Sequence, residues 1–358
     1  MTRRPAAGAA LLLGFVLFAA ACSSTGGPAD GGEQRPSKAA ASSPTPTPTP
    51  RPVTIAFGGD VHFEGQLANR LAANPRTAMG PIASALRRAD LAMVNLETAV
   101  GTRGDPAPKD FTFQAPSSAF RALKGAGVDV ASMANNHGMD FGEQGLTDSL
   151  TAAKRQDFPV VGIGENAQQA YAPHLVTVNN QRIAIVGATQ VLDDHLITAW
   201  TAGEDKPGLA SAKKVPRLVK AVRAAGSKAD TVVVFLHWGQ ELQSCPLPRQ
   251  RSLADRLIEA GADVIVGGHA HVLQAGGFLR GRYVHYGLGN FVFYSGSGET
   301  AQSGVLTLTV AGGKVTRAKW KPAVLSGGIP LALERAEAKA ARAEWTSLRG
   351  CAALAEKP

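Results

Sequence analysis

The chain is poor in cysteine, with three in 358 residues, and aromatic residues make up only 6% of it. It contains no basic run with interleaved aromatic residues, so the formal net charge of +9 does not indicate nucleic-acid binding. The apolar stretch near the N-terminus, residues 6–21, is too short and too rich in small residues for a comfortable membrane span. We therefore expect neither a nucleic-acid partner nor a spanning helix at the N-terminus.

The N-terminus instead has the pattern of a bacterial export signal. Arg3 and Arg4 precede the apolar stretch, which ends in small residues and Cys22. Residues 19–22 resemble a lipobox, in which the cysteine is lipidated and becomes the new N-terminus. We predict a lipoprotein signal peptide over residues 1–22, a lipid anchor in the bilayer, and a location on the extracytoplasmic face of the cell membrane. A plain cleaved signal peptide with a chance cysteine is the alternative.

A linker and one large domain are expected after this signal. Residues 23–52 are rich in Gly, Ser, Ala and Pro and include a Thr-Pro repeat. This composition cannot bury a core, so we predict a disordered spacer. No second linker of this kind follows, and α/β folds reach this size without splitting. We predict a catalytic domain over residues 53–300 and a C-terminal extension over residues 301–358.

The two cysteines that remain predict a disulfide. If Cys22 carries lipid, Cys245 and Cys351 are the only other thiols. An oxidising compartment favours their pairing. Two independent buried thiols are the alternative.

Hydrophobic, β-branched runs alternate with segments of helical spacing. The strand-like runs cover residues 53–57, 91–94, 128–133, 160–163, 182–186, 231–236 and 264–266, and the helical segments cover 82–88, 145–154, 215–224 and 253–260. This alternation predicts an α/β fold, a layered β-sandwich with flanking helices whose sheets are largely parallel. Asn179 and Asn180 predict a hairpin turn. The tail predicts a hairpin over 305–320 and a helix from about Leu331 to Leu348.

Side chains that can bind a metal follow five of the strand-like runs. They are Asp60 with His62, Asn95 with Glu97, Asn136 with His137, His237 with Glu241, and His269 with His271. Ligands in α/β folds lie where strands end, so we expect these clusters to meet as in a two-metal hydrolytic site. Three clusters taken alone have a plainer explanation: Asp60 as a turn residue, residues 135–137 as a polar loop, and His237 as a core residue. His269 and His271 are hard to explain as packing.

In this order the clusters, together with Asp140 and residues 288–291, resemble the CapA family of capsule or poly-γ-glutamate synthesis proteins. The resemblance covers about residues 53–293, nearly the whole of the predicted domain. That family is similar in fold to the calcineurin-like metallophosphoesterases. The resemblance therefore implies a calcineurin-like architecture for this chain.

The resemblance also implies a ligand set for two divalent metal ions. Asp60, His62 and His271 would hold one ion, and Asn136, His237 and His269 the other. Phosphoesterases bridge their ions with an aspartate from a motif that is missing here, so Glu97 is the expected bridge. Mixed nitrogen and oxygen ligands suit Mn, Fe or Zn better than Ca. His137 would protonate the leaving oxygen.

Five further residues are expected close to the site: Asn95, Asp140, Trp238, Glu241 and Asn290. Asp140 and Glu241 would either orient a neighbouring histidine or cap a helix. Trp238 and Phe291 would either line the substrate crevice or serve in packing. Asn290 is expected to form a loop beside the site.

The predicted function is a membrane-anchored, metal-dependent, phosphoesterase-like hydrolase in capsule or poly-γ-glutamate metabolism, acting on a phosphoester or an anionic polymer. The alternative is a non-enzymatic polymer-binding or export component, working with membrane subunits of a polyglutamate synthase. A third possibility is an amide hydrolase, because metal-activated water can attack carbon as well as phosphorus. The nearly complete ligand set favours chemistry over binding alone.

Overall fold

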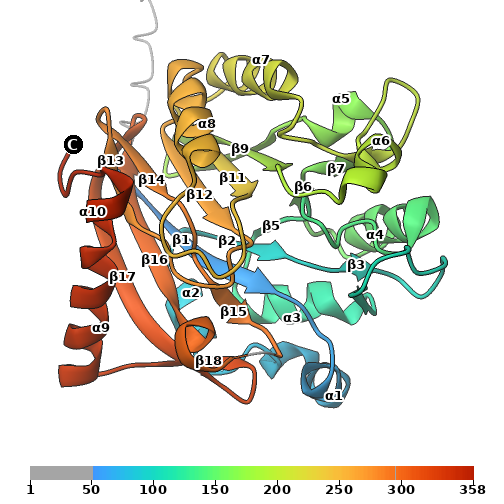
Figure 1. Cartoon of the computed structure of the whole chain (residues 1–358), viewed down its shortest axis with the longest axis horizontal. Helices are drawn as coiled ribbons and strands as arrows, with labels where there is room; N and C mark the ends of the chain where they lie inside the picture. The colour runs from blue at the N-terminus through green and yellow to red at the C-terminus, as the bar shows by residue number, and fades with distance from the viewer. Residues whose placement is uncertain (1–50, 295) are drawn as a thin grey trace, which may run out of the picture. The chain divides into compact units, whose positions relative to one another are not determined.

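The computed structural model describes residues 51–294 and 296–358 (Figure 1). The predicted signal peptide, Cys22 and almost all of the predicted linker lie outside the described residues. Among the helices that are described, none combines the length and the apolar character needed to cross a bilayer.

The first sheet has eight strands and is centred on β1. Its order is β18, β17, β16, β1, β2, β5 and β6, and β15 also pairs with β1. The strands are β1 (Val53–Val61), β2 (Leu91–Leu96), β5 (Val130–Ser132), β6 (Val160–Val161), β15 (Asn290–Val292), β16 (Gln302–Ala311), β17 (Lys314–Ser326) and β18 (Ile329–Ala332). β1, β2, β5 and β6 are parallel, whereas β16, β17 and β18 add antiparallel pairs.

The second sheet has six strands in the order β13, β14, β12, β11, β9 and β8. They are β8 (His174–Val178), β9 (Gln181–Thr189), β11 (Thr231–His237), β12 (Val264–Gly268), β13 (Gly276–Leu279) and β14 (Arg282–His285). β9, β11, β12 and β14 are parallel, and β8 and β13 pair antiparallel at the two edges. Short pairs are formed by β3 (Ala99–Val100) with β4 (Gln114–Ala115) and by β7 (Ile163–Gly164) with β10 (Gly208–Leu209).

Alternate side chains of the central strands enter different apolar layers. In β1, Ile55 and Phe57 join the layer between the two sheets, whereas Ala56 joins the layer beneath the helices on the other face. In β11, Phe235 enters the inner layer and Val234 the outer one. Strands buried on both faces are hydrophobic without interruption. The predicted α/β sandwich is confirmed.

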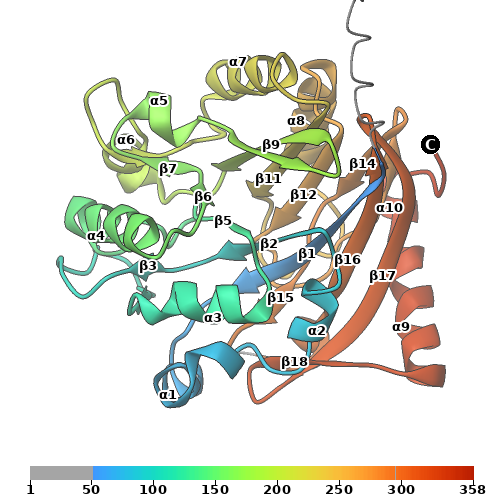
Figure 2. The same ribbon diagram turned by 180° about the vertical axis from the view of Figure 1, so that it is seen from behind.

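Helices cover the outer faces of both sheets. α1 (Gln66–Ala73), α2 (Ala83–Leu86), α3 (Ser118–Ala126) and α4 (Gly142–Arg155) pack on the first sheet, and α5 (Ala167–Ala170), α7 (Val215–Gly226) and α8 (Pro248–Glu259) pack on the second. Figure 2 shows α7 and α8 on the side away from α1, α2 and α3. The short α6 (Ile197–Trp200) follows β9, and α9 (Arg335–Ser347) and α10 (Arg349–Ala352) end the chain.

Most predicted elements are confirmed, including all seven strand-like runs and the four helical segments. The predicted turn joins β8 to β9, and Asn179 and Asn180 have the positive φ angles of 51° and 62° that a tight hairpin requires. The tail hairpin is β16 with β17, and it extends the first sheet beside β1. The predicted start of the last helix is wrong. Leu331 lies in β18, where it pairs with Val324 of β17, and the helix begins at Arg335.

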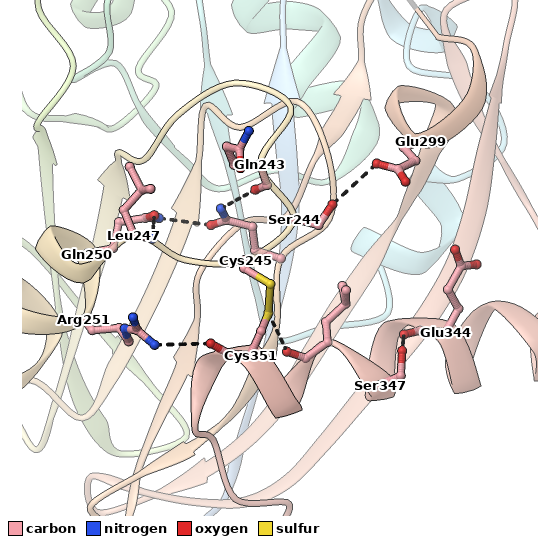
Figure 3. Close-up of a disulfide and its surroundings, with 12 residues drawn as sticks. Gln243, Ser244, Cys245, Leu247, Gln250, Arg251, Glu299, Glu344, Ser347 and Cys351 are labelled. Atoms are coloured by element: carbon pink, nitrogen blue, oxygen red, sulfur yellow. Dashed lines mark hydrogen bonds between the residues drawn. A yellow bond between two sulfur atoms is a disulfide. The ribbon is translucent and has the colours of Figure 1, made fainter.

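The predicted disulfide between Cys245 and Cys351 is present, with 5.7 Å between the Cα atoms, so the alternative of two separate thiols is wrong. It joins the loop between β11 and α8 to α10 (Figure 3). Gln274 Nε2 donates a hydrogen bond to the Gln243 carbonyl at 2.7 Å, and Arg251 donates one to the Cys351 carbonyl at 3.3 Å. The C-terminal helix is thus tied to a loop that follows a central strand.

Replacing both cysteines with serine should lower the free energy of unfolding by about 2 to 5 kcal/mol, because the cystine closes a long loop in the unfolded chain. The sequence separation it bridges is 106 residues. Urea unfolding of the oxidised protein and of the double variant measures this loss. A reductant should weaken the wild-type protein and leave the double variant unchanged. Equal unfolding free energies for the two oxidised proteins would contradict the expectation.

Candidate metal centre

The candidate metal centre lies where the central strands of both sheets end. Asp60 lies near the end of β1, Glu97 follows β2, His237 ends β11, and His269 and His271 follow β12. Parallel pairing sets Asp60 beside Asn95 and His237 beside Gly268. A Cβ atom on Gly268 would lie 2.2 Å from Asp60 Oδ1, so only glycine there leaves room for the carboxylate.

Donor atoms of these side chains form three groups, within each of which they lie less than 4.8 Å apart. The groups are Glu97 with His237 and His269, Asp60 with Glu97 and His271, and Glu241 with His269 and His271. Glu97 belongs to two groups and links the Asp60 side to the His237 side. Its position agrees with the predicted bridge, and its binding of metal stays a prediction.

The Glu97 carboxylate is fully buried and only half satisfied. Its Oε1 has no hydrogen-bond partner among the described residues, and it lies 3.6 Å from His237 Nε2 and 4.0 Å from His137 Nε2. The buried Nδ1 of His269 also has no partner within the described chain. Leaving a buried carboxylate unpaired costs several kcal/mol, so unpartnered oxygen and nitrogen atoms that converge on one point fit a divalent cation.

Burial shifts the pKa values of the buried carboxylate and of the imidazoles in opposite directions. It raises the pKa of Glu97 well above its usual value, and the charges of Asp60 and Glu241 add to the effect. Burial lowers the pKa of His269 to about 3 and holds the pKa of His237 well below its ordinary value. The imidazoles are therefore neutral, the form that binds metals. The carboxylates carry an electrostatic cost that a cation would remove.

Asn95 connects the ligand candidates, as expected for a residue close to the site. Its Nδ2 donates to Asp60 Oδ1 at 2.8 Å and lies 3.3 Å from Glu97 Oε2 and 3.2 Å from His237 Nδ1. Its Oδ1 accepts a hydrogen bond from Asn135 at 3.0 Å. One amide thus positions side chains from both sheets.

Asn136 and His137 face the same centre. Asn136 Oδ1 lies 2.7 Å from His237 Nε2, which places it beside the predicted second metal position. His137 Nδ1 lies 2.5 Å from Asp140 Oδ2, and this contact turns Nε2 toward Glu97. Of the two alternatives for Asp140, the structure shows the orienting one, because Asp140 makes no capping bond to α4.

His62 lies beside the cluster but belongs to none of the donor groups found among the described residues. Its Nδ1 lies 3.2 Å from the Glu64 backbone N and its Nε2 lies 3.0 Å from the Tyr294 backbone N. Its ring also stacks on Phe113 with 4.8 Å between centroids. A neutral imidazole has only one acceptor nitrogen, so these backbone donors compete for it. The contacts give no support to His62 as a ligand.

Of the two alternatives for Trp238 and Phe291, the structure shows packing, so the alternative of lining the crevice is wrong. Trp238 is fully buried, stacks on Tyr286 with centroids 5.6 Å apart, and donates its indole N–H to the Tyr286 carbonyl at 2.7 Å. Phe291 is equally buried and lies against Gly58. Phe291 belongs to the apolar layer on the outer face of the first sheet, and Trp238 to the one on the outer face of the second sheet.

Glu241 and Asn290 both lie beside the histidine pair, Glu241 near both rings and Asn290 next to His271. Glu241 is exposed and caps no helix, and its carboxylate belongs to the donor group of His269 and His271. Asn290 begins β15, so the prediction of a loop is wrong. Its Oδ1 lies 2.8 Å from His271 Nδ1, which places it within hydrogen-bonding distance of a ligand candidate.

Sequence reasoning missed Lys109, a nearly buried cation at the edge of the centre. Its Nζ lies 2.9 Å from Asp140 Oδ1, donates to the Asn136 carbonyl, and stands 5.3 Å from the Trp200 ring centroid. It balances the charge of the carboxylate that orients His137. A single lysine in an irregular segment has no periodicity or motif that could have revealed it.

These features define the class of protein: an α/β sandwich with carboxylate, amide and imidazole side chains gathered at the strand ends in a candidate dinuclear metal centre. Residues 54–295 match the family model described as bacterial capsule synthesis protein PGA_cap. The chain belongs to this family, and the resemblance to CapA proteins is confirmed.

Curated relatives agree with this assignment. The capsule biosynthesis protein CapA of Bacillus anthracis is 36% identical over 203 residues, which cover 56% of this chain and 48% of that protein. The PGA biosynthesis protein CapA of Bacillus subtilis (strain 168) is 36% identical over 202 residues, or 56% and 52% of the two chains. The chain thus spans about half the length of the curated relatives it matches.

Solved structures with a similar fold include two enzymes. A putative 5'-nucleotidase from Staphylococcus aureus is 17% identical with a TM-score of 0.44, covering 82% of this chain and 58% of that one. The Thermus thermophilus sulfate thiohydrolase SoxB is 14% identical with a TM-score of 0.46, covering 83% and 60%. At these scores the two structures carry no argument about the activity of this chain.

Glu97→Gln should stabilise the metal-free protein at pH 8 by about 1 to 3 kcal/mol, because it removes a buried charge. The raised pKa of Glu97 makes the wild type lose stability as the pH rises above 4.5, so the advantage of the variant should shrink toward pH 4.5. Urea unfolding in a chelator across this range measures the difference.

Added Mn²⁺ should make the wild type more stable than Glu97→Gln, because the wild type binds the ion and the variant does not. The matched comparison is the same pair of proteins in chelator. A variant advantage that stays constant from pH 8 to pH 4.5, or equal stabilisation of both proteins by Mn²⁺, would argue against a bridging Glu97.

Proposed function

We propose that this chain is a metal-dependent hydrolase of the phosphoester type that acts in bacterial capsule or poly-γ-glutamate metabolism. The observation that carries the proposal is the unpartnered Oε1 of Glu97, which is buried and faces His237 and His137. A purely structural carboxylate at this depth would have a hydrogen-bond donor or a basic partner at both oxygens, whereas Glu97 has one only at Oε2. The relatives' names, which refer to capsule and PGA biosynthesis, support the pathway.

Two divalent ions, of Mn, Fe or Zn, are the proposed cofactors. Asp60, Glu97 and His271 would hold one, and Asn136, His237, His269 and Glu97 would hold the other, with Glu241 close to the histidine pair. Such ions, when bound, would supply an activated water and neutralise charge on a transferring phosphoryl group.

His137 is the proposed acid for the leaving group. The Asp140 carboxylate accepts a hydrogen bond from Nδ1 of His137. The proton available for transfer is therefore the one on Nε2 of His137, which faces the centre. Burial lowers the pKa of His137, and the Asp140 carboxylate opposes that shift. Lys109 donates to the other carboxylate oxygen of Asp140, Oδ1. This contact keeps Asp140, and through it His137, in one orientation.

The proposed setting is the extracytoplasmic face of the cell membrane, with a lipid anchor at Cys22. The cystine between Cys245 and Cys351 supports this setting, because such bonds persist in oxidising compartments. Membrane subunits of a polyglutamate synthase are the proposed partners. A second candidate function, binding of an anionic polymer without hydrolysis, is favoured by Lys213 and Arg249, which border a cavity of about 680 Å³ beside His269.

Metal content and turnover together test the proposal. The purified protein should hold close to two transition-metal ions per chain by mass spectrometry and should hydrolyse phosphodiester or phosphomonoester substrates. His237→Ala should lose both metal and turnover. His137→Gln should keep the metal and lose about 10² to 10⁴ in kcat, the usual contribution of a general acid.

His174→Ala is the matched control, because His174 lies on the edge strand β8 away from the donor groups. It should change neither metal content nor kcat. No stoichiometric metal and no turnover after addition of Mn or Zn would overturn the hydrolase proposal and leave the polymer-binding role.

A further inference from the structure

Exposed apolar side chains gather at one edge of the metal centre. Among the described residues, the large hydrophobic side chains that are exposed are Phe111, Leu175, Leu242, Tyr294, Val324 and Leu331. Three of these six line a single cavity of about 240 Å³, with Phe111 64%, Leu242 62% and Tyr294 39% exposed. They come from three segments that are distant in the sequence. Exposed apolar groups gathered in this way mark a surface that another molecule covers.

The floor of this cavity belongs to the metal centre. His137, His271, Glu241 and Asn290 all line it. The proposed acid and a proposed metal ligand are therefore accessible from the apolar side. A ligand lying in the cavity would touch the reacting groups directly.

Two buried aromatic rings form a fixed inner wall. Phe113 stacks on His137 with centroids 4.0 Å apart and rings 20° from parallel, and Phe293 lies 4.7 Å from the His271 ring. The backbone N–H of Phe113 also donates to Asp140 at 2.7 Å. The inner wall is thus held by the groups that orient the acid, while Phe111, Leu242 and Tyr294 form the open rim.

The larger cavity differs in character. It has a volume of about 680 Å³, borders Asn136 and His269, and is lined by the cations Lys213 and Arg249 and by the carboxylates of Asp193 and Glu241. Glu241 lines both cavities. The metal centre therefore lies between a polar space with cations and a smaller apolar space.

We propose that the cavity of about 240 Å³ is a subsite for an aromatic or similarly planar apolar group on the leaving alcohol of the substrate. An apolar cavity of about 150 Å³ can hold benzene, so one aromatic ring fits this volume. This assignment of the leaving group rests on the proposed hydrolase function. With the leaving alcohol in this subsite, the anionic part of the substrate beyond the phosphorus would lie in the larger cavity, beside Lys213 and Arg249.

The position of His137 decides which part of the substrate lies there. In the hydrolysis, the oxygen of a water bonds to phosphorus and the bond from phosphorus to the alcohol oxygen breaks. That alcohol oxygen takes the proton from His137 Nε2, one proton of the water stays on the phosphate product, and its other proton restores His137. Because His137 lines the apolar cavity, the group that accepts its proton is the one held by the apolar walls.

A matched pair of esters tests the subsite through turnover. 2-Phenylethyl phosphate and ethyl phosphate have leaving alcohols of similar basicity, so they differ mainly in the phenyl ring. The wild type should favour the phenyl ester by at least tenfold in kcat/KM, and Phe111→Ala or Leu242→Ala should reduce this preference about tenfold. Leu175→Ala, which removes an exposed apolar side chain on β8, should leave the preference unchanged.

Binding of the two phosphonates gives a readout that needs no turnover. Calorimetry with 2-phenylethylphosphonate and ethylphosphonate, with Mn²⁺ and in chelator, should show tighter binding of the phenyl compound and loss of that preference in Phe111→Ala. If neither ester turns over but this preference is found, the hydrolase proposal fails and the apolar subsite stands. Equal binding of the two phosphonates, or a preference that Phe111→Ala does not change, overturns the subsite.

Discussion

Burial of the Glu97 carboxylate is the constraint on which the rest of the structure depends. A carboxylate in the interior must be protonated, paired with a cation, or surrounded by donors. Here Asn95 satisfies one oxygen and the other faces imidazoles. Asp60, His237, His269 and His271 each have a donor atom within 4.8 Å of one on Glu97. A positive charge placed among them would compensate the buried carboxylates.

The two sheets supply this arrangement because their parallel strands end at the same place. The inner layer holds the sheets together through side chains such as Phe57 and Phe235, so the strand ends cannot move independently. Glycines let the backbones approach closely, as Gly268 does beside Asp60. The helices of each outer layer bury the remaining strand faces. The candidate centre therefore rests on strand ends that a shared core holds in place.

The sequence could predict the strands, because burial on both faces leaves a continuous β-branched run. It could also predict most of the site, because a polar cluster directly after five of these runs is a local pattern. It could not predict Lys109 or Phe111, which lie in an irregular segment between β3 and β4 without any period. The spacing of His62 resembles that of a ligand, but its contact with Tyr294, 232 residues away, depends on tertiary structure.

The spread of the site along the chain has a consequence for how the protein matures. Asp60 is made early, His271 late, and Cys351 later still, so a partial chain that ends before His271 lacks part of the set of donor atoms. Both His269 and His271 lie inside the segment that the cystine closes, between Cys245 and Cys351. The cystine can close only after Cys351 has been made, which is 80 residues beyond the last of these donor residues. The loop that carries both histidines is therefore fixed covalently only when the chain is almost complete.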